Sequence, residues 1–122
     1  MDKVDFVADT NAIIYAIEGN PSMRGFIQCT PAVSVITEIE LLGKRGILPH
    51  EADEIRMLLS GLPIIRLTES IKEAAISLKQ RYSVKLPDAV IAATALCLKL
   101  PLCTADLGFD KIQEIETILI TP

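Results

Sequence analysis

Short apolar runs alternate along the chain with longer segments in which apolar residues recur every three or four positions. Uninterrupted apolar runs predict strands buried on both faces, and the periodic segments predict helices. The predicted strands are residues 4–8, 32–36, 64–67, 102–104 and 117–120. The predicted helices are residues 10–18, 37–43, 51–59, 69–82 and 87–99, with a shorter one near 23–28. This alternation predicts a three-layer α/β fold with a central, mainly parallel five-stranded sheet.

Length and composition predict one small domain, residues 1–122, with enough apolar residues to form a core without cross-links. The N-terminus has no basic stretch followed by an apolar one, so we expect no signal peptide and a cytoplasmic protein. The uncharged, mainly apolar run of residues 90–98 is too short to span a membrane. Half of the residues are apolar, which in a small domain favours a covered surface and therefore a homodimer.

The cysteines, the histidine and the net charge argue against three kinds of site: a zinc site, a catalytic histidine and a surface that is basic throughout. Cys29, Cys97 and Cys103 lack the paired spacing of zinc ligands, so we expect reduced core cysteines. His50 lies in an expected loop without a candidate catalytic partner, so we expect a structural or exposed position. The net charge of −4 argues against a surface that is basic throughout, although it leaves room for a local basic rim.

Acidic residues stand where predicted strands end or helices begin, at Asp9, Glu40, Asp88 and Asp106. Parallel sheets bind ligands at the carboxyl ends of their strands, where Asp9 and Asp106 are expected. Asp88 opens a helix that is apolar almost all round, and it can reach the same edge. Carboxylates that converge repel one another and retain protons unless a cation neutralises them. Oxygen ligands of this kind predict a Mg²⁺ or Mn²⁺ site.

The polar neighbours of two of these acids suggest supporting roles. Thr10 and Asn11 follow Asp9 and can orient its carboxylate or nearby waters, although Asp9 can equally be only a helix cap. Thr104 precedes Asp106, and its hydroxyl can bind a ligand or a phosphate oxygen. Asp106 can equally be an ordinary turn residue.

The other two acids also have structural interpretations. Asp88 can simply complement the dipole of its helix. Thr37 and Glu40 match a capping box, in which the glutamate would bind the threonine's backbone N–H. Glu38 competes with Glu40 for the functional role, because they lie about 200° apart on a helix and only one can face the active edge. Periodicity alone leaves this choice open.

Taken together, these motifs resemble those of the PIN-domain ribonucleases, and within them the VapC-type toxins of toxin–antitoxin pairs. The similarity covers most of the chain, in DTNAIIYAIEGNP, SVITEIELLGKRG, LPDAVIAATAL and LPLCTADLGF. The resemblance implies a PIN-like α/β/α fold and an acidic quartet made of Asp9, Glu40, Asp88 and Asp106. It selects Glu40 over Glu38, because the family carries this acid in the pattern Thr-x-x-Glu-Leu.

The same resemblance implies a metal-dependent endoribonuclease. Mg²⁺ or Mn²⁺ held by the quartet would activate water for attack on RNA, leaving a 5′-phosphate and a 3′-hydroxyl. Asn11 and Thr104 would support the site. The protein partner would be an antitoxin, whose C-terminal segment fills the active-site groove and often supplies a basic residue.

The chain departs from the family pattern beside the last acid. Gly108 precedes Phe109 where relatives often carry another acid or a histidine, and Ala105 replaces a residue that is often polar. Asp110 is expected to be out of register with the site. The quartet is complete, but the departures keep open an alternative, a degenerate PIN-like domain that binds RNA or a protein partner without cleaving.

Nucleic-acid contacts are weakly encoded. Four basic residues are expected to rim the site and bind phosphates, or else to be solvated surface charges: Lys44, Arg45, Arg81 and Lys85. With two tyrosines and three phenylalanines, base stacking cannot be the main source of affinity.

A phospho-acceptor receiver domain is a competing small parallel α/β fold that also binds Mg²⁺ through acids at strand ends. It requires an aspartate after the third strand and a lysine after the fifth. Here the third predicted strand runs into Thr68-Glu69, and the fifth ends at Thr121-Pro122. Both requirements fail, so this fold is disfavoured.

Overall fold

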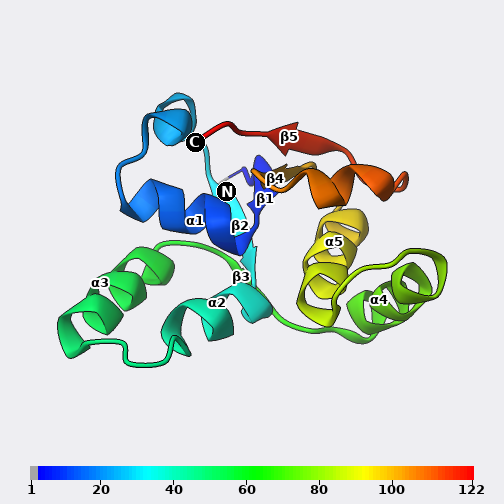
Figure 1. Cartoon of the computed structure of the whole chain (residues 1–122), viewed down its shortest axis with the longest axis horizontal. Coiled ribbons are helices and arrows are strands. Elements are labelled where there is room, and N and C mark those ends of the chain that lie inside the picture. The colour runs from blue at the N-terminus through cyan, green and yellow to red at the C-terminus, as the bar shows by residue number, and fades with distance from the viewer. Residues whose placement is uncertain (1–2) are drawn as a thin grey trace.

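A five-stranded, all-parallel sheet forms the middle layer of the computed structural model, which describes residues 3–122 (Figure 1). The strands are β1 (Phe6–Ala8), β2 (Pro31–Ser34), β3 (Ile64–Ile65), β4 (Leu102–Thr104) and β5 (Thr117–Leu119). They lie in the order β3-β2-β1-β4-β5. The chain therefore builds outward from β1 to β3 and then returns to add β4 on the other side of β1. Such a switch point leaves a crevice at the carboxyl ends of the two strands.

Helices cover both faces of this sheet. They are α1 (Thr10–Ile17), α2 (Val35–Leu42), α3 (Pro49–Ser60), α4 (Glu69–Arg81) and α5 (Leu86–Leu98), with the 3₁₀ helices η1 (Pro21–Phe26) and η2 (Leu107–Lys111). In Figure 1, α4 and α5 lie on one side of the strands, and α1 and α3 lie on the other. The predicted three-layer α/β fold is confirmed, whereas η2 was not predicted.

Alternating side chains of each strand enter two separate cores. In β1, Val7 packs in the core beneath α4 and α5, with Leu78 and Ile91. Phe6 and Ala8 belong to the opposite core, which α1, α2, α3 and η1 share. Successive residues of a strand point to opposite faces, so burial of the whole strand requires helices on both sides.

The start of α2 differs from the prediction, which extended the second strand to residue 36 and placed a capping box at Thr37. The β-branched residues around position 35 suggested a longer strand, but Ser34 ends it by capping α2, its hydroxyl accepting from the N–H of Ile36 at 3.1 Å. Thr37 is a fully buried residue within the helix. The capping-box interpretation of Glu40 is therefore wrong.

The cysteines and the histidine occupy varied positions. Cys103 is buried in β4 and Cys29 is half-buried, but Cys97 is exposed, so the expectation of a core position is wrong for Cys97. Burial in α5 stops at residue 95, and Cys97 lies in the final turn beyond it. His50 is exposed, as expected, but it lies in the first turn of α3 and not in a loop. Within residues 3–122, no helix has the length and apolar character needed to cross a membrane.

Candidate active site

The carboxyl ends of β1 and β4 open into a small cavity of about 160 Å³, which we call the acidic cavity. Acidic residues from four separate elements line it: Asp9 after β1, Glu40 in α2, Asp88 in the first turn of α5, and Asp106 after β4. The other lining residues are Thr10, Asn11, Ile91 and Phe109. The fold thus brings the four predicted acids, and the exposed Asn11, to one place at the switch point of the sheet.

Asp9 is the most firmly held of the four acids. It is 4% exposed, one carboxylate oxygen accepts from the N–H of Ala12 at 2.8 Å, and the other accepts from the hydroxyl of Thr104. The bond to Ala12 caps α1, so one side chain both caps the helix and lines the cavity. These bonds fix the orientation of the carboxylate before any ligand binds.

Thr104 acts on Asp9 and not, as one prediction had it, on a ligand. Its side chain is fully buried, and its hydroxyl donates to Asp9 while it accepts from the backbone N–H of Asp106 at 2.9 Å. A hydroxyl has a single proton to donate, and Asp9 receives it. Direct contact between Thr104 and a phosphate oxygen is therefore excluded in this arrangement, because the group is both buried and engaged.

Thr10 orients Glu40, whereas the sequence suggested that it would orient Asp9. Its hydroxyl donates to Glu40 Oε1 at 2.5 Å and lies 3.1 Å from the hydroxyl oxygen of Thr37. The two hydroxyls connect the first turn of α1 to α2 and direct Glu40 toward the cavity. Glu38 lines a different cavity, beside residues of α3 and β3. The geometry therefore favours Glu40 over Glu38, as the family resemblance did.

Asp106 begins η2 and is held by the backbone of that helix. Its Oδ1 accepts from the N–H of Gly108 at 2.7 Å, so the turn interpretation of Asp106 is also realised. A β-carbon at position 108 would lie 3.0 Å from the same oxygen, so the absence of a side chain lets the carboxylate lie close to the backbone. Asp110 does not line the acidic cavity, and its carboxylate accepts from the hydroxyl of Thr117 at 3.0 Å. Asp110 is therefore out of register with the site, as expected.

Burial and mutual repulsion disturb the ionisation of two of these acids. Burial is the main cause of a raised pKa at Asp9, and neighbouring carboxylates of the cavity add to it, against the effect of its hydrogen bonds. Burial also raises the pKa of Asp88, reinforced by the carboxylates of Asp106 and Glu40 and opposed by two nearby lysines. Because burial and like charge make the ionised carboxylates unfavourable, binding of a cation in the cavity would stabilise them.

The donor set suits a hard divalent cation. The lining offers carboxylate oxygens without imidazole or thiolate groups, which is the chemistry that Mg²⁺ and Mn²⁺ prefer. As the side chains stand, residues 3–122 contain no group of three or more such ligands spaced to hold an ion. Asp9, Glu40 and Asp106 each direct an oxygen at a hydrogen-bond donor of the protein. Glu40 and Asp106 are exposed and can change rotamer, so the residues fit the ion by their chemistry.

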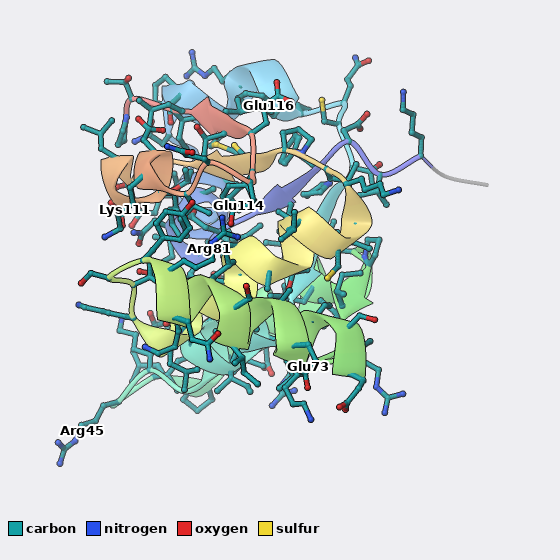
Figure 2. All side chains as sticks on the ribbon, turned by 90° about the vertical axis from the view of Figure 1, so that its right-hand side faces the viewer. Arg45, Glu73, Arg81, Lys111, Glu114 and Glu116 are labelled. Carbon is teal, nitrogen blue, oxygen red and sulfur yellow. The ribbon has the colours of Figure 1, made fainter. Side chains whose placement is uncertain are left out.

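The predicted basic rim is only partly formed. Lys85 lines a cavity that adjoins the acidic one, and Lys44 lines a groove on the opposite side. Arg45 extends from the body of the protein into solvent, and Arg81 forms an ion pair with Glu114 at 2.5 Å (Figure 2). Neither arginine lines the acidic cavity or these two neighbours, so of the four predicted basic residues only Lys44 and Lys85 line a cavity beside the acids.

Sequence reasoning missed one basic residue beside the site. Lys111 lies at the end of η2 and lines the same adjoining cavity as Lys85. Its position depends on η2 and on a contact with the backbone of Ser83, which is distant in sequence. No local pattern in the sequence predicts either feature.

Comparisons with known proteins agree with this geometry. The family model described as PIN domain matches residues 6–115. A chain from a toxin–antitoxin complex of Klebsiella pneumoniae is 33% identical, and the match covers 93% of this chain and 97% of that chain with a TM-score of 0.78. A chain of VapBC-1 from nontypeable Haemophilus influenzae is 25% identical, and the match covers 95% of this chain and 98% of that chain with a TM-score of 0.78.

A chain of VapBC2 from Rickettsia felis, solved with a DNA fragment from the promoter, shares the fold. It is 22% identical with a TM-score of 0.78, and the match covers 97% of this chain and 100% of that chain. A search of curated proteins gives no significant match. The family model nevertheless spans almost every element that builds the acidic cavity, from β1 to the loop beyond η2. The chain therefore belongs to the PIN domain family, with VapBC toxin–antitoxin proteins among its structural relatives.

Proposed function

We propose that this protein is a metal-dependent endoribonuclease, the toxin of a toxin–antitoxin pair. One observation carries the proposal: carboxylates from four elements line a single cavity at the switch point of the sheet. Burial and like charge raise the pKa values of Asp9 and Asp88, so a merely structural cluster of this kind would be unfavourable. Membership of the PIN family, whose nucleases generally use divalent metal ions, supports the same activity.

Each side chain of the cavity has a distinct task in this proposal. Asp9, Asp88 and Asp106 would hold Mg²⁺ or Mn²⁺, and Glu40 would hold a second ion or a water. When bound, the ion supplies Lewis acidity, which activates water and offsets charge on the phosphodiester. Thr104 keeps Asp9 in its orientation through a buried hydrogen bond. Such outer hydrogen bonds orient the groups that contact a metal.

Cleavage of total RNA by the purified protein tests the activity. We expect cleavage with Mg²⁺ or Mn²⁺ and none with EDTA. Asp9→Asn, purified identically, should be inactive while keeping its fold, because asparagine caps a helix as well as aspartate but carries no charge. Equal residual cleavage by both proteins would contradict the proposal and indicate a contaminating nuclease.

A degenerate PIN domain that binds RNA or a protein without cleaving is the alternative function. The absence of a polar side chain at Gly108 favours it, since that position adjoins Asp106. All four acids of the cavity remain, which favours the enzyme. Metal-dependent cleavage distinguishes the two, because a degenerate domain would bind RNA with no metal-dependent product.

The antitoxin proposal has a candidate docking place. A groove of about 340 Å³ between α1, α2 and α3 adjoins the acidic cavity, with Thr10 and Glu40 in both linings. Its apolar lining includes Ile14 and Ile55, and its acidic residues, which define what we call the carboxylate groove, are Glu18, Glu40, Glu51 and Glu54. An apolar segment with a basic residue suits this surface.

A groove variant and a matched surface variant test this docking. Ile14→Asp should abolish inhibition by an added antitoxin and leave cleavage intact. Ile76→Asp is the control, because Ile76 lies exposed on α4, away from the groove. Full inhibition of both variants would contradict docking in the carboxylate groove.

The predicted homodimer also stays a proposal. Large apolar side chains are exposed at Ile27 (77%) and Met57 (78%), and burial of such groups favours self-association. Light scattering of the purified protein should give twice the mass of one chain. A mass of one chain across the accessible concentrations would contradict the dimer.

A further inference from the structure

A second cavity, of about 200 Å³, adjoins the acidic cavity on the side of α4 and η2. The two cavities share Asp88, Asp106 and Phe109, so they are direct neighbours. Lys85 and Lys111 line only the second one, which we call the lysine cavity. Gly108 also lines it, and the missing side chain there leaves the space open beside Asp106.

Both lysines face this space with their charges available. The ammonium of Lys111 donates to the carbonyl of Ser83, which holds it across the opening. Lys85 precedes the first turn of α5, whose free N–H groups add positive potential. Both lysines share the lining of the lysine cavity with Asp88 and Asp106, which also line the acidic cavity. Within residues 3–122, neither lysine forms an ion pair.

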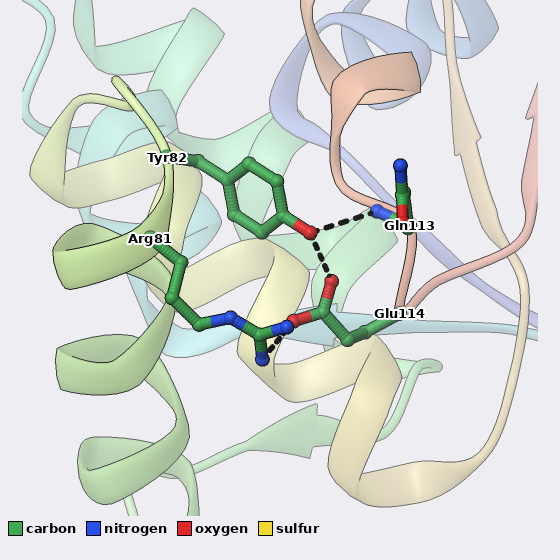
Figure 3. Close-up of polar contacts among 4 residues, drawn as sticks. All are labelled: Arg81, Tyr82, Gln113 and Glu114. Atoms are coloured by element: carbon green, nitrogen blue, oxygen red, sulfur yellow. Dashed lines mark hydrogen bonds and ion pairs between the residues drawn. The ribbon is translucent and has the colours of Figure 1, made fainter.

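A cluster of contacts, which we call the latch, joins residues that lie close in sequence to those lining the lysine cavity (Figure 3). Glu114 accepts from the hydroxyl of Tyr82 at 2.5 Å and pairs with Arg81 at 2.5 Å, and the Tyr82 hydroxyl also accepts from the N–H of Gln113 at 3.4 Å. The latch ties the end of α4 to the segment after η2. Lys85 follows the end of α4 by four residues, and Lys111 ends η2 just before Gln113 and Glu114, so both lysines lie close in sequence to the latch.

In the carboxylate groove, which also adjoins the acidic cavity, the charged side chains are mainly acidic rather than basic. The carboxylate groove contains four glutamates and one lysine, Lys44, which lies 3.9 Å from Glu51. An RNA backbone carries a negative charge at every phosphate, so the four glutamates of the groove repel it, whereas in the lysine cavity two lysines balance Asp88 and Asp106. An RNA strand can therefore approach the acidic cavity more favourably through the lysine cavity than through the carboxylate groove.

We propose that the lysine cavity is a subsite for one backbone phosphate of RNA, next to the phosphate that is cleaved. Lys85 and Lys111 bind this phosphate through its charge, without reading the base. The subsite defines the path of the bound strand, which runs from the acidic cavity toward the loop after α4 and η2. This inference rests on the proposed nuclease function and adds to it the path of the substrate.

The salt dependence of RNA binding tests the subsite. The probe is a short fluorescein-labelled oligouridylate, measured by anisotropy over a range of NaCl concentrations with Mg²⁺, in an Asp9→Asn background that leaves the RNA intact. Removing one phosphate contact lowers the slope of log K against log salt by about 0.7 to 1. We expect this decrease for Lys85→Gln combined with Lys111→Gln.

Two further variants separate charge from structure. Lys72→Gln combined with Lys99→Gln makes the same charge change outside both cavities, and its slope should match the parent's. Lys85→Arg combined with Lys111→Arg keeps the charges and should restore the slope. Loss of thermal stability in the glutamine variant with an unchanged slope would mean that the lysines only brace the loops, and it would overturn the inference.

The binding experiment tests the subsite separately from the proposed nuclease activity, which RNA cleavage tests. Metal-dependent cleavage by the wild-type protein, together with equal slopes for the glutamine variant and its control, would overturn the subsite alone. Failure of the parent to bind the oligonucleotide at low salt would overturn it as well. A reduced slope without any metal-dependent cleavage would support the subsite and contradict the nuclease.

Discussion

Asp9 lines the acidic cavity at the end of β1, and Thr104 binds Asp9 from within the core at the end of β4. We call this pair the wall, and its two residues are 4% and 0% exposed. Arg81 and Glu114 of the latch have side chains that are 58% and 20% exposed. The wall is fixed by buried hydrogen bonds that include backbone groups, whereas the latch consists mainly of side-chain contacts near solvent. Buried bonds resist competition from water. In the proposed nuclease, the wall would therefore hold the reacting groups, and the latch would influence how the substrate approaches.

The largest effect is expected in the wall, for Thr104→Val. The substitution keeps the shape but leaves an oxygen of Asp9 without its donor, which costs about 1–3 kcal/mol of unfolding free energy. Loss of an outer hydrogen bond to a metal-binding group lowers activity by about 10–100-fold. Urea unfolding and initial rates of RNA cleavage measure the two effects.

Thr94→Val is the matched control for this substitution. Thr94 is equally buried, but its hydroxyl donates only to the carbonyl of Val90 within α5, at 2.8 Å. Cleavage should remain at the wild-type rate in this variant. Equal loss of activity in both valine variants would show that Thr104 has no special relation to Asp9.

A smaller effect, on stability, is expected from Asp9→Asn in EDTA. Burial raises the pKa of Asp9 above its ordinary value of 3.8 in the folded protein, so the folded state binds the proton more tightly than the unfolded chain. The contribution of Asp9 to the free energy of unfolding is therefore most favourable below that value, and it falls as the pH rises through the folded pKa. In Asp9→Asn, position 9 carries no titrating group, so its contribution to the free energy of unfolding does not fall as the pH rises.

Relative to wild type, the free energy of unfolding of Asp9→Asn should therefore increase from acidic to neutral pH. Urea unfolding in EDTA at a series of pH values measures this difference. Mg²⁺ should then stabilise the wild type more than the variant, because only the wild type retains the full set of charged ligands. A wild type that gains stability over the variant as the pH rises would contradict the raised pKa.

The smallest effect is expected in the latch, for Tyr82→Phe. The variant loses the hydroxyl that binds Glu114, so the lysine cavity is held less firmly, and KM should rise a few-fold with kcat unchanged. The Tyr82 hydroxyl is the main cause of a lowered pKa at Glu114, so its stabilising effect is full above the ordinary value of 4.5 and is lost as the pH falls through the folded pKa.

The stability deficit of Tyr82→Phe should accordingly be largest at neutral pH and should shrink in acid. Thermal unfolding at several pH values, with cleavage kinetics at neutral pH, gives both readouts. A large fall in kcat with an unchanged KM would mean that the latch belongs functionally with the wall, and the distinction between the two regions would not hold.

The positions of the acids were accessible to sequence reasoning, whereas the hydrogen bond within the wall and the contacts of the latch were not. Apolar strands followed by Asp9 and Asp106 predict where carboxylates gather, because ligands of parallel sheets lie at the carboxyl ends of the strands. The strand order that makes this place a switch point came from the structure. The bond from Tyr82 to Glu114 spans 32 positions, and the one from Lys111 to Ser83 spans 28. Neither follows from periodicity, since both depend on how separate loops pack.

The errors within the site have a similar origin. Thr37 and Glu40 satisfied the pattern of a capping box, but Ser34 had already begun the helix, which freed Glu40 for the cavity. Thr10 and Thr104 were each assigned to the wrong partner, because a hydroxyl binds whichever acceptor the tertiary fold brings near it. Local propensity predicted the elements, and long-range packing decided the hydrogen bonds.

The central claim is that the four acids of the cavity act together on RNA, and the cleavage rates of single variants test it most directly. The panel, assayed with Mn²⁺ under identical conditions, is Asp9→Asn, Glu40→Gln, Asp88→Asn, Asp106→Asn and the control Glu38→Gln. We predict rates lower by at least about 100-fold for the first four, as for loss of a preorganised charge-stabilising group, and the wild-type rate for Glu38→Gln. Wild-type rates in the cavity variants, or an equal loss in Glu38→Gln, would contradict the claim.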